Sequence, residues 1–320
     1  MNRRSFLRSV GFAGAVAACG GAFAQSQGRT IRLVVSLSPG SAIDFQARMI
    51  APYLSANLGQ TVVVENKPGG KDLIALTDVI KSAPDGHTLY MGSQSPLAIN
   101  VAVVKNLPYD PRRDLTPISG ISLVNHVLVV KSSHPAKTLA EFIAYAKQNR
   151  GKVSIGYSTS LVQMEIAAIN KLAGIDLFAI PYKGTPATIT DVLGDTLSAT
   201  LLDPGNALPL LKSGQVRALG VTSLKRNPLT PDIPAISETL PGYDFPAWTA
   251  MVGPPGMRSE VVKKIHAAVD NALKQKDVVD KLALAATNPF FTSPEDLKAL
   301  IAADTTKWIN LSREANIQPE

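Results

Sequence analysis

The chain has 320 residues, of which 45% are hydrophobic and 18% charged, and its formal net charge is +7. This composition indicates a well-packed globular protein. The basic residues form no run of five and no stripe interleaved with aromatic residues, which excludes a typical nucleic-acid-binding protein. Beyond the first residues, no apolar stretch approaches the roughly 20 residues of a membrane-spanning helix.

The first 24 residues are typical of an export signal. A twin-arginine signal is favoured, because the paired arginines are followed by Ser5-Phe6-Leu7, and an ordinary Sec signal stays open. The features in chain order are Arg3, Arg4 and Arg8, an apolar stretch at Val10–Ala18, and the signal-peptidase pattern Ala22-Phe23-Ala24.

The only cysteine of the sequence, Cys19, lies inside this signal. It follows Val16-Ala17-Ala18, a weak match to a lipid-attachment motif. Cleavage after Ala24 is favoured over lipid attachment, and the mature chain then begins at Gln25 without any cysteine. The protein would therefore be periplasmic, with no disulfide and no thiolate metal site.

The 296 residues that follow the signal suggest two domains. They contain 29 basic and 25 acidic residues, so their formal charge is +4. This mild excess suits a small anionic ligand.

Short apolar strands alternate with helices in the first part of the mature chain. Such alternation implies parallel pairing with right-handed crossovers, and it predicts an α/β fold. Ala83-Pro84-Asp85-Gly86 carries strong turn signals. The expected elements are strand 31–36, helix 44–58, strand 61–65, helix 72–82 and strand 88–92.

A second run of alternating elements begins near residue 124, and three helices close the chain. Thr138 and Glu141 have the spacing of a capping box, and Ser293-Pro294 is typical of a helix start. The expected strands are 124–130, 153–156, 178–181, 199–202, 216–221 and 248–252. The expected helices are 138–148, 161–173, 187–193, 206–213, 259–274, 277–286 and 293–310.

Three expected strand-to-helix loops share one design, in which small and polar residues lead directly into a helix. Backbone N–H groups, hydroxyl donors and the positive end of a helix dipole together suit an oxyanion such as a carboxylate or phosphate. One such loop alone is weak evidence, because Ser and Gly are also ordinary helix caps. Three loops split between the two runs are expected to face one another across a cleft. They are Ser38-Pro39-Gly40-Ser41, Tyr157-Ser158-Thr159-Ser160 and Lys183-Gly184-Thr185.

An exported serine hydrolase stays open as an alternative. The segment 156–160 is near the G-x-S-x-G nucleophile elbow, with Ser158 at its centre, although the last Gly is missing. Asp203 and His266 follow in the order of an α/β-hydrolase. The other histidines form no H-x-x-x-H or H-E-x-x-H pair, and there is no phosphate loop. We therefore assign no catalytic residue, metal ligand or cofactor.

An ordered set of motifs resembles the substrate-binding proteins of tripartite tricarboxylate transporters, the Bug-type receptors. The resemblance runs over essentially the whole mature chain. The motifs are Pro39-Gly40-Ser41-Ala42-Ile43-Asp44 with Ala47-Arg48, Val64-Glu65-Asn66-Lys67-Pro68-Gly69, Ala83-Pro84-Asp85-Gly86, Pro181-Tyr182-Lys183-Gly184, and Lys212-Ser213-Gly214 with Arg217-Ala218-Leu219-Gly220-Val221-Thr222-Ser223.

The resemblance implies the two-lobed clamshell of periplasmic binding proteins, the Venus flytrap fold. Each lobe is then a mixed, mostly parallel sheet flanked by helices. Lobe 1 would comprise residues 27–123 and 246–320, and lobe 2 residues 124–245. The chain would cross between the lobes near Val124 and Phe245.

The family binds small carboxylates mainly through backbone amides, hydroxyls and ordered water. Asp44 could instead only cap its helix, Lys183 could be a solvated charge, and Asp203 could be a turn residue. Carried over by position, the contacts in lobe 1 are Ser38, Gly40, Ser41, Asp44, Gly69, Gly70 and Ser93. Those in lobe 2 are Ser158, Thr159, Ser160, Lys183, Gly184 and Asp203.

The chain departs from the family pattern where the ligand is expected. Ser41 stands where a second Gly is usual, and Ser158-Thr159-Ser160 replaces a Gly-rich loop. Gly70-Lys71-Asp72-Leu73 stands where a Gly-rich loop and an Asn are common. Lys71 could pair with a second carboxylate of the ligand, or with Asp72. The identity of the ligand is therefore not transferred from relatives.

The resemblance implies a non-enzymatic receptor that captures a dicarboxylate or an aromatic or aliphatic carboxylic acid. Its partners would be this small ligand and the membrane permease subunits of a tripartite transporter, with no nucleic acid and no cofactor. The receptor would act as a monomer. A carboxylate receptor that signals to a membrane sensor stays open as a second alternative.

Overall fold

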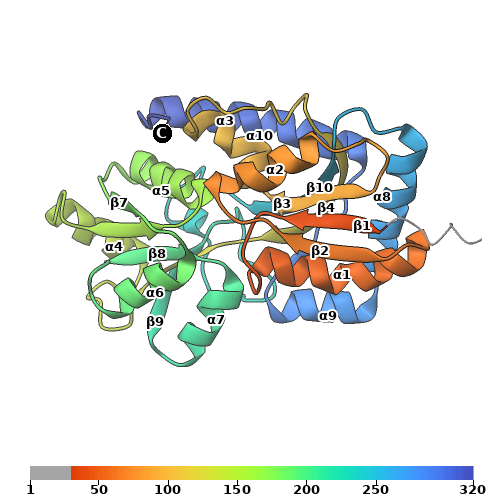
Figure 1. Ribbon diagram of the computed structural model, residues 1–320. Coiled ribbons are helices and arrows are strands. Elements are labelled where there is room, and N and C mark those ends of the chain that lie inside the picture. Colours follow the sequence, from red (N-terminus) through yellow and green to blue (C-terminus); the bar gives the residue numbers. More distant parts are fainter. Residues whose placement is uncertain (1–29, 320) are drawn as a thin grey trace, which may run out of the picture.

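The computed structural model describes residues 30–319, so the predicted export signal, with Cys19 and Ala24, lies outside the described residues. Within that range, none of the helices combines the length and the apolar character that crossing a membrane requires. Two β-sheets lie side by side, each between helices (Figure 1).

The first sheet has the strand order β11-β4-β10-β3-β1-β2. β1 pairs in parallel with β2 and with β3, whereas β10 runs antiparallel between β3 and β4. β1 to β4 therefore point the same way. The bounds are β1 (Ile31–Val35), β2 (Val62–Asn66), β3 (Thr88–Ser93), β4 (Thr116–Val124), β10 (Ala247–Gly253) and β11 (Asn288–Pro289).

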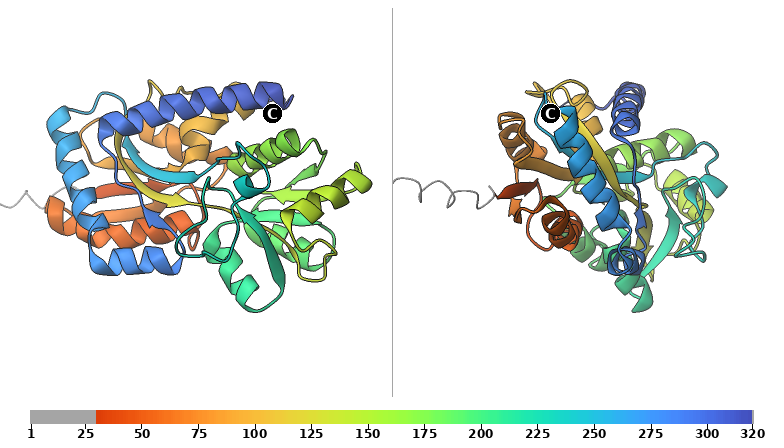
Figure 2. Two further views of the ribbon diagram at one scale, coloured as in Figure 1. Left: turned by 180° about the vertical axis from the view of Figure 1, so that it is seen from behind. Right: turned by 90° about the vertical axis from the view of Figure 1, so that its right-hand side faces the viewer.

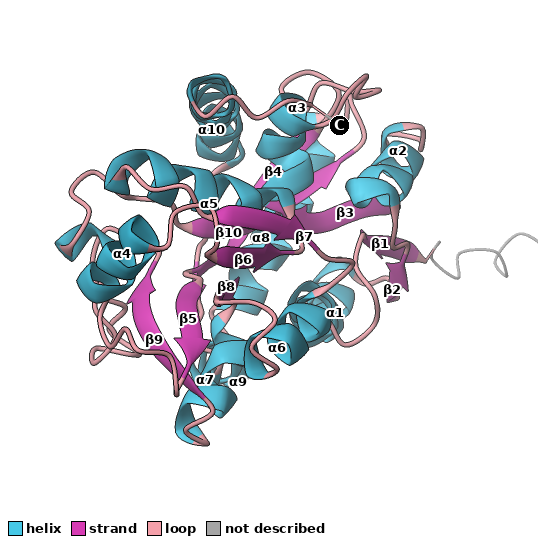
Figure 3. Ribbon diagram, turned by 90° about the vertical axis from the view of Figure 1, so that its left-hand side faces the viewer, coloured by secondary structure: helices cyan, strands magenta, loops and turns pink. Residues whose placement is uncertain are grey.

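The second sheet has the order β7-β6-β8-β5-β9 (Figure 3). β6 is parallel to β7 and β8, and β5 is antiparallel to β8 and β9. The prediction of two mixed sheets, with most strands in one direction, is confirmed. The bounds are β5 (Val127–Lys131), β6 (Ser154–Tyr157), β7 (Phe178–Pro181), β8 (Ala199–Leu202) and β9 (Val216–Val221).

Helices cover both faces of the first sheet, which explains why β1 is apolar at successive positions. Leu33 and Val35 pack in the cluster with α1, α8 and α9, whereas Val34 packs in the cluster with α2 and α10. The helices are α1 (Ala42–Leu58), α2 (Leu73–Ile80), α3 (Asn100–Val103), α4 (Leu139–Gln148), α5 (Ser160–Ala173), α6 (Thr185–Leu193), α7 (Pro204–Lys212), α8 (Ser259–Leu273), α9 (Lys276–Leu284) and α10 (Pro294–Glu314).

α10 connects the two halves of the molecule. It packs along β4 of the first sheet, and its last turns reach α5 beside the second sheet (Figure 2). Trp308 of α10 is fully buried, and its ring lies 5.4 Å from that of Phe245 in the segment between β9 and β10. The two halves therefore share one continuous apolar cluster.

The expected strand 124–130 is found as β5, but its predicted start at Val124 is wrong, because two strands of different sheets meet there. β4 ends at Val124 and β5 begins at Val127, and the polar residues Asn125 and His126 lie between them. The sequence did not predict β4, whose Ser119, Gly120 and Ser122 interrupt the apolar pattern. The helical segment 95–103 was not expected either.

Candidate functional site

The carboxyl ends of β1 to β4 lie at the edge of the first sheet that faces the second (Figure 1). β6 to β9 end at the opposing edge. β10 and β5 run in the other direction, so the crossings from Val124 to Val127 and from Val221 to Ala247 lie at these edges too. In open α/β sheets, ligands bind beyond the carboxyl ends of the strands. The predicted site residues lie at or beyond the ends of β1, β2, β3, β6, β7 and β8.

The loop after β1 is held in place by one buried carboxylate. Asp44 is 3% exposed and accepts hydrogen bonds from the Gly40 amide at 2.9 Å, Asn66 Nδ2 at 2.9 Å and Arg48 Nε at 3.0 Å. Burial would raise the pKa of Asp44, but these hydrogen bonds outweigh it and lower the pKa. Gly40 has a φ of 84°, which favours glycine. Asp44 thus supports the loop, while Ser41 caps α1 through its Oγ.

We expect Asp44→Ala to lower the free energy of unfolding by about 2 kcal/mol, because the Gly40 and Asn66 donors lose their acceptor. Urea unfolding of the purified variant measures this. Asp280→Ala is the matched control, since Asp280 only pairs with Lys276 on the surface of α9. Its effect should stay within about 0.5 kcal/mol. Equal losses in the two variants would contradict a supporting role for Asp44.

The loop after β2 has left-handed backbone at four successive residues. The φ angles of Gly69, Gly70, Lys71 and Asp72 are 121°, 60°, 52° and 72°. Lys71 and Asp72 are not glycines, so this conformation costs on the order of 1 kcal/mol at each. The chain turns sharply here, and the half-buried Asp72 lies directly before the first residue of α2.

Two of the loops in the second lobe are joined by their hydroxyls. Ser158 Oγ, after β6, lies 3.3 Å from Thr185 Oγ1, after β7. Thr159 caps α5 by accepting a hydrogen bond from the Val162 amide. The amides of Ser160 and Leu161, in the first turn of α5, have no partner within the helix, as at any helix start. This loop has the donors that an oxyanion needs.

Lys183, Gly184 and Asp203 lie at the same edge. Lys183 is exposed, and Gly184 is half-buried with extended backbone at a φ of 179°. Asp203 caps α7, since Oδ1 accepts from the Asn206 amide at 3.1 Å and Oδ2 from Asn206 Nδ2 at 2.6 Å. Ser38, Gly69 and Gly70 are exposed and Ser93 is half-buried. The structure therefore brings all thirteen predicted residues to the two facing edges.

Asn100 connects the two edges, and the sequence did not single it out. This fully buried side chain donates from Nδ2 to the Lys71 carbonyl at 2.8 Å. Its Oδ1 accepts from Ser160 Oγ at 2.9 Å. Asn100 thus links a first-lobe loop to the start of α5. The pair is 60 residues apart in the chain, so no local pattern predicts it.

A buried pair, His126 and Glu165, lies at the first crossing. Glu165 is fully buried, and its two carboxylate oxygens lie 2.7 and 3.0 Å from His126 Nδ1. Burial alone would lower the pKa of His126, but the carboxylate outweighs it and the pKa is raised. The His126 amide donates to Thr222 Oγ1, and the Thr222 amide donates to the His126 carbonyl. The pair therefore joins α5 to both crossings.

The hydrolase alternative is not supported, because its three residues are not assembled. Ser158 bonds Thr185, and Asp203 bonds Asn206. His266 lies on α8, where its Nδ1 is 2.9 Å from the Ile118 carbonyl and its ring stacks on Phe291. No hydrogen bond within residues 30–319 joins two of these three residues. In the same range, no cluster of three His, Cys, Asp or Glu side chains could hold a metal.

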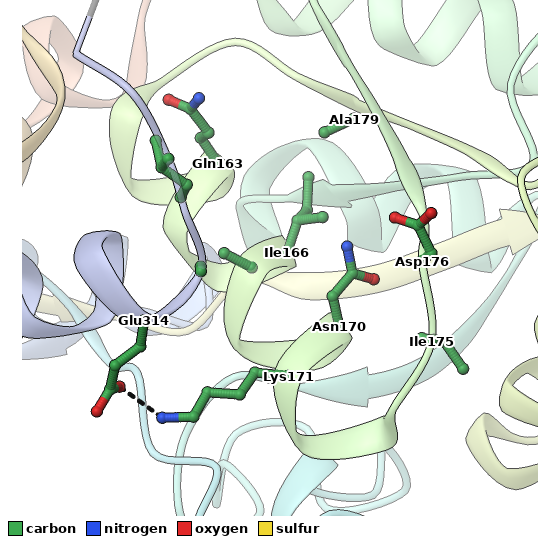
Figure 4. A pocket seen from close by; sticks show the side chains of 11 residues that line it. Gln163, Ile166, Asn170, Lys171, Ile175, Asp176, Ala179 and Glu314 are labelled. Atoms are coloured by element: carbon green, nitrogen blue, oxygen red, sulfur yellow. Dashed lines mark hydrogen bonds and ion pairs between the residues drawn. The ribbon is translucent and has the colours of Figure 1, made fainter.

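A groove of about 340 Å³ lies elsewhere, between α5 and the end of α10 (Figure 4). Ile166 and Asn170 of α5 line it, and the ion pair between Lys171 and Glu314 crosses its rim. It contains none of the predicted site residues, because it involves the later turns of α5 and not the loop before it.

The family model of the tripartite tricarboxylate transporter family receptor matches residues 46–317. The chain belongs to this family. It is 30% identical to the protein BugT of Bordetella pertussis over 292 residues, which are 89% of each chain. The family and the fold are those of periplasmic binding proteins and not of enzymes, and receptors of this family are periplasmic.

Two solved structures of Rhodopseudomonas palustris proteins are similar over most of the chain. One is Rpa4515 with adipate, with a TM-score of 0.85 and 31% identity, covering 91% of this chain and 99% of that one. The other is MatC with bound malate, with a TM-score of 0.80 and 28% identity, covering 88% and 98%. The family and the fold predicted from the ordered motifs are confirmed.

Proposed function

We propose that this protein is a periplasmic receptor that binds a small dicarboxylate between its two lobes and delivers it to the membrane permease of a tripartite transporter. The observation that carries the proposal is the placement of three oxyanion-suited loops on two facing edges, after β1, β6 and β7. The relatives with adipate and malate support a dicarboxylate as the ligand class. No reaction of the ligand is part of the proposal.

The lobes in this proposal comprise residues 27–123 with 246–320, and residues 124–245. The receptor acts as a monomer and has no cofactor. A ligand that contacts the loops of both lobes stabilises their closed arrangement through its differential contacts. Of the thirteen predicted contacts, Asp44 acts indirectly, by supporting the loop that contains Gly40.

A thermal-shift screen with succinate, malate, adipate and matched monocarboxylates tests this function. At about 100 times the dissociation constant, binding should stabilise the folded protein by about 2.7 kcal/mol. Lys183→Ala should weaken binding roughly tenfold, because a charged hydrogen-bond donor to the carboxylate is lost. Lys276→Ala removes another exposed lysine, on α9, and should bind as wild type.

No stabilisation by any carboxylate, in protein first unfolded and refolded to remove bound ligand, would contradict the proposal. Capture of permease subunits from solubilised membranes, dependent on the stabilising ligand, tests the transport role separately. Capture of a membrane sensor in place of the permease would reassign the receptor to signalling.

A further inference from the structure

The direction of one hydrogen-bond chain decides what the Ser160 hydroxyl can offer a ligand. The Lys71 carbonyl can only accept a hydrogen bond, so the Asn100 atom 2.8 Å from it is the Nδ2 donor. Asn100 Oδ1 then faces Ser160, and this oxygen has no proton to give. Ser160 Oγ is therefore the donor in its 2.9 Å contact with Asn100.

Burial holds the Asn100 amide in this orientation. The residue is only 1% exposed, so water does not replace either of its partners. A flipped amide would place Oδ1 against the Lys71 carbonyl, and two acceptors in contact away from water cost free energy. The chain of hydrogen bonds thus runs in one direction, from Ser160 through Asn100 to Lys71.

Ser160 lies between the two lobes with its proton already bonded. It is the first residue of α5 in the second lobe, it is half-buried, and its partner Asn100 belongs to the first lobe. A serine hydroxyl has one proton and two lone pairs. Ser160 Oγ therefore offers a ligand a lone pair, which a carboxylate oxygen, itself an acceptor, cannot use.

Two other hydroxyls of the predicted site have the opposite polarity. Ser41 Oγ accepts a hydrogen bond from the Asp44 amide, and Thr159 Oγ1 accepts from the Val162 amide, both at 3.3 Å. A hydroxyl that caps a helix in this way keeps its proton for a further bond. Ser41 and Thr159 can therefore donate to carboxylates, one from each lobe.

We propose that the ligand is a dicarboxylate with a hydroxyl on the carbon next to one carboxylate, and that this hydroxyl donates a hydrogen bond to Ser160 Oγ. This inference rests on the proposed function. The carboxylates bind the backbone amides and the hydroxyls of Ser41 and Thr159. Asn100 is a positioning residue, because it takes up the Ser160 proton and so makes Ser160 an acceptor for the ligand.

A hydroxyl fits this place better than the ammonium of an amino acid. An ammonium placed between the lobes would also need a carboxylate as partner. Asp44 and Asp203, one on each edge, already accept hydrogen bonds from groups of their own loops. The neutral donor needs only the lone pair of Ser160.

Isothermal titration calorimetry at pH 7.5 tests the inference with ligand pairs that differ only in the hydroxyl. The pairs are malate against succinate and 2-hydroxyadipate against adipate, each hydroxy acid as both enantiomers. The better enantiomer should bind about threefold to tenfold more tightly than its partner, which is the range of one neutral hydrogen bond. 2-Fluorosuccinate, which cannot donate, should bind no more tightly than succinate.

Ser160→Ala should bind the two members of a pair with Kd values within about twofold of each other. The ratio is the readout, because a change in lobe closure affects both ligands alike. Asn100→Ala frees the Ser160 proton and should reduce the preference for the hydroxyl to less than half of its wild-type value. Ser132→Ala is the matched control and should keep the wild-type ratio, since Ser132 Oγ donates to the Gly214 carbonyl at the far end of the second sheet.

Equal affinities within both pairs in the wild type would overturn this inference and leave the proposed function intact. Binding of 2-fluorosuccinate as tightly as malate would overturn it too, because Ser160 would then be a donor. Tighter binding of aspartate than of malate would overturn the choice of a hydroxyl. A wild type that binds no dicarboxylate would contradict the proposed function and this inference together.

Discussion

His126→Ala is expected to lower the free energy of unfolding by about 3–5 kcal/mol at pH 7.5, because it leaves a buried carboxylate without its partner. Glu165 is 0% exposed, and the imidazole of His126 provides the hydrogen bond to its carboxylate. Tyr243 does not replace it, since its hydroxyl points to the backbone carbonyl of Glu165 at 3.5 Å. Lys307 exerts an electrostatic influence on the pKa of Glu165 but is bonded to the Asp244 carbonyl.

The loss in free energy of unfolding caused by His126→Ala should become smaller as the pH falls toward 5. Burial raises the pKa of Glu165, and removal of the neighbouring imidazolium raises it further. Because its pKa is raised, Glu165 destabilises the folded variant as the pH rises and the carboxyl ionises. At low pH the carboxyl is protonated, and burying it costs less free energy. Urea unfolding at pH 5 and at pH 7.5 measures the free energy of unfolding under the two conditions.

His266→Ala is the matched control for this change. His266 is half-buried and bonds a backbone carbonyl, without any carboxylate. At pH 7.5, the loss of the His266 side chain should lower the free energy of unfolding by only about 1 kcal/mol. If His126→Ala costs no more than His266→Ala at pH 7.5, then Glu165 is not held as a carboxylate by His126.

Asp72→Asn is expected to stabilise the unliganded protein by up to about 3 kcal/mol at pH 7.5 and by less than about 1 kcal/mol at pH 4. The folded pKa of about 6 lies above the ordinary 3.8, so the wild type loses stability as the pH rises from about 4 through 6. Asparagine cannot ionise, and it tolerates the left-handed backbone at φ 72° as well as aspartate does.

Thermal and urea unfolding between pH 4 and 8 measure the gap between Asp72→Asn and the wild type. Asp195→Asn keeps the left-handed backbone and alters only a surface ion pair with Lys131, so it should change stability by less than about 1 kcal/mol. If the difference in free energy of unfolding between Asp72→Asn and the wild type is the same at pH 4 and pH 7.5, then Asp72 does not titrate near pH 6.

Much of the site could be predicted from the sequence, because its loops are local features. Small and polar residues between an apolar strand and a helix place hydroxyls and amides at a strand end, as found for Ser158 and Thr159. The caps follow the same local rule, since Thr138 and Ser293 accept from the amides three residues later. Such features depend only on neighbours within one turn of helix.

The roles of single side chains could not be predicted from local sequence features. Asp44 lies in a motif expected to bind the ligand, yet its carboxylate accepts hydrogen bonds from Arg48, Asn66 and Gly40. Asn66 is the last residue of β2, 22 residues further along the chain than Asp44. Whether a polar side chain contacts the ligand or supports a loop depends on such distant partners.

By itself, the sequence determined the α/β alternation, the membership of the receptor family and the loops with anion-binding character. These properties follow from hydrophobic periodicity and from motifs in a fixed order. Both can be recognised in the sequence without knowledge of tertiary contacts. Only the tertiary structure decided that the segment 124–130 is divided between two sheets, that Asn100 bridges the lobes, that His126 pairs with Glu165, and that the pKa of Asp72 is raised. Burial and long-range pairing set these properties, because the free energy of a charge depends on which distant groups surround it.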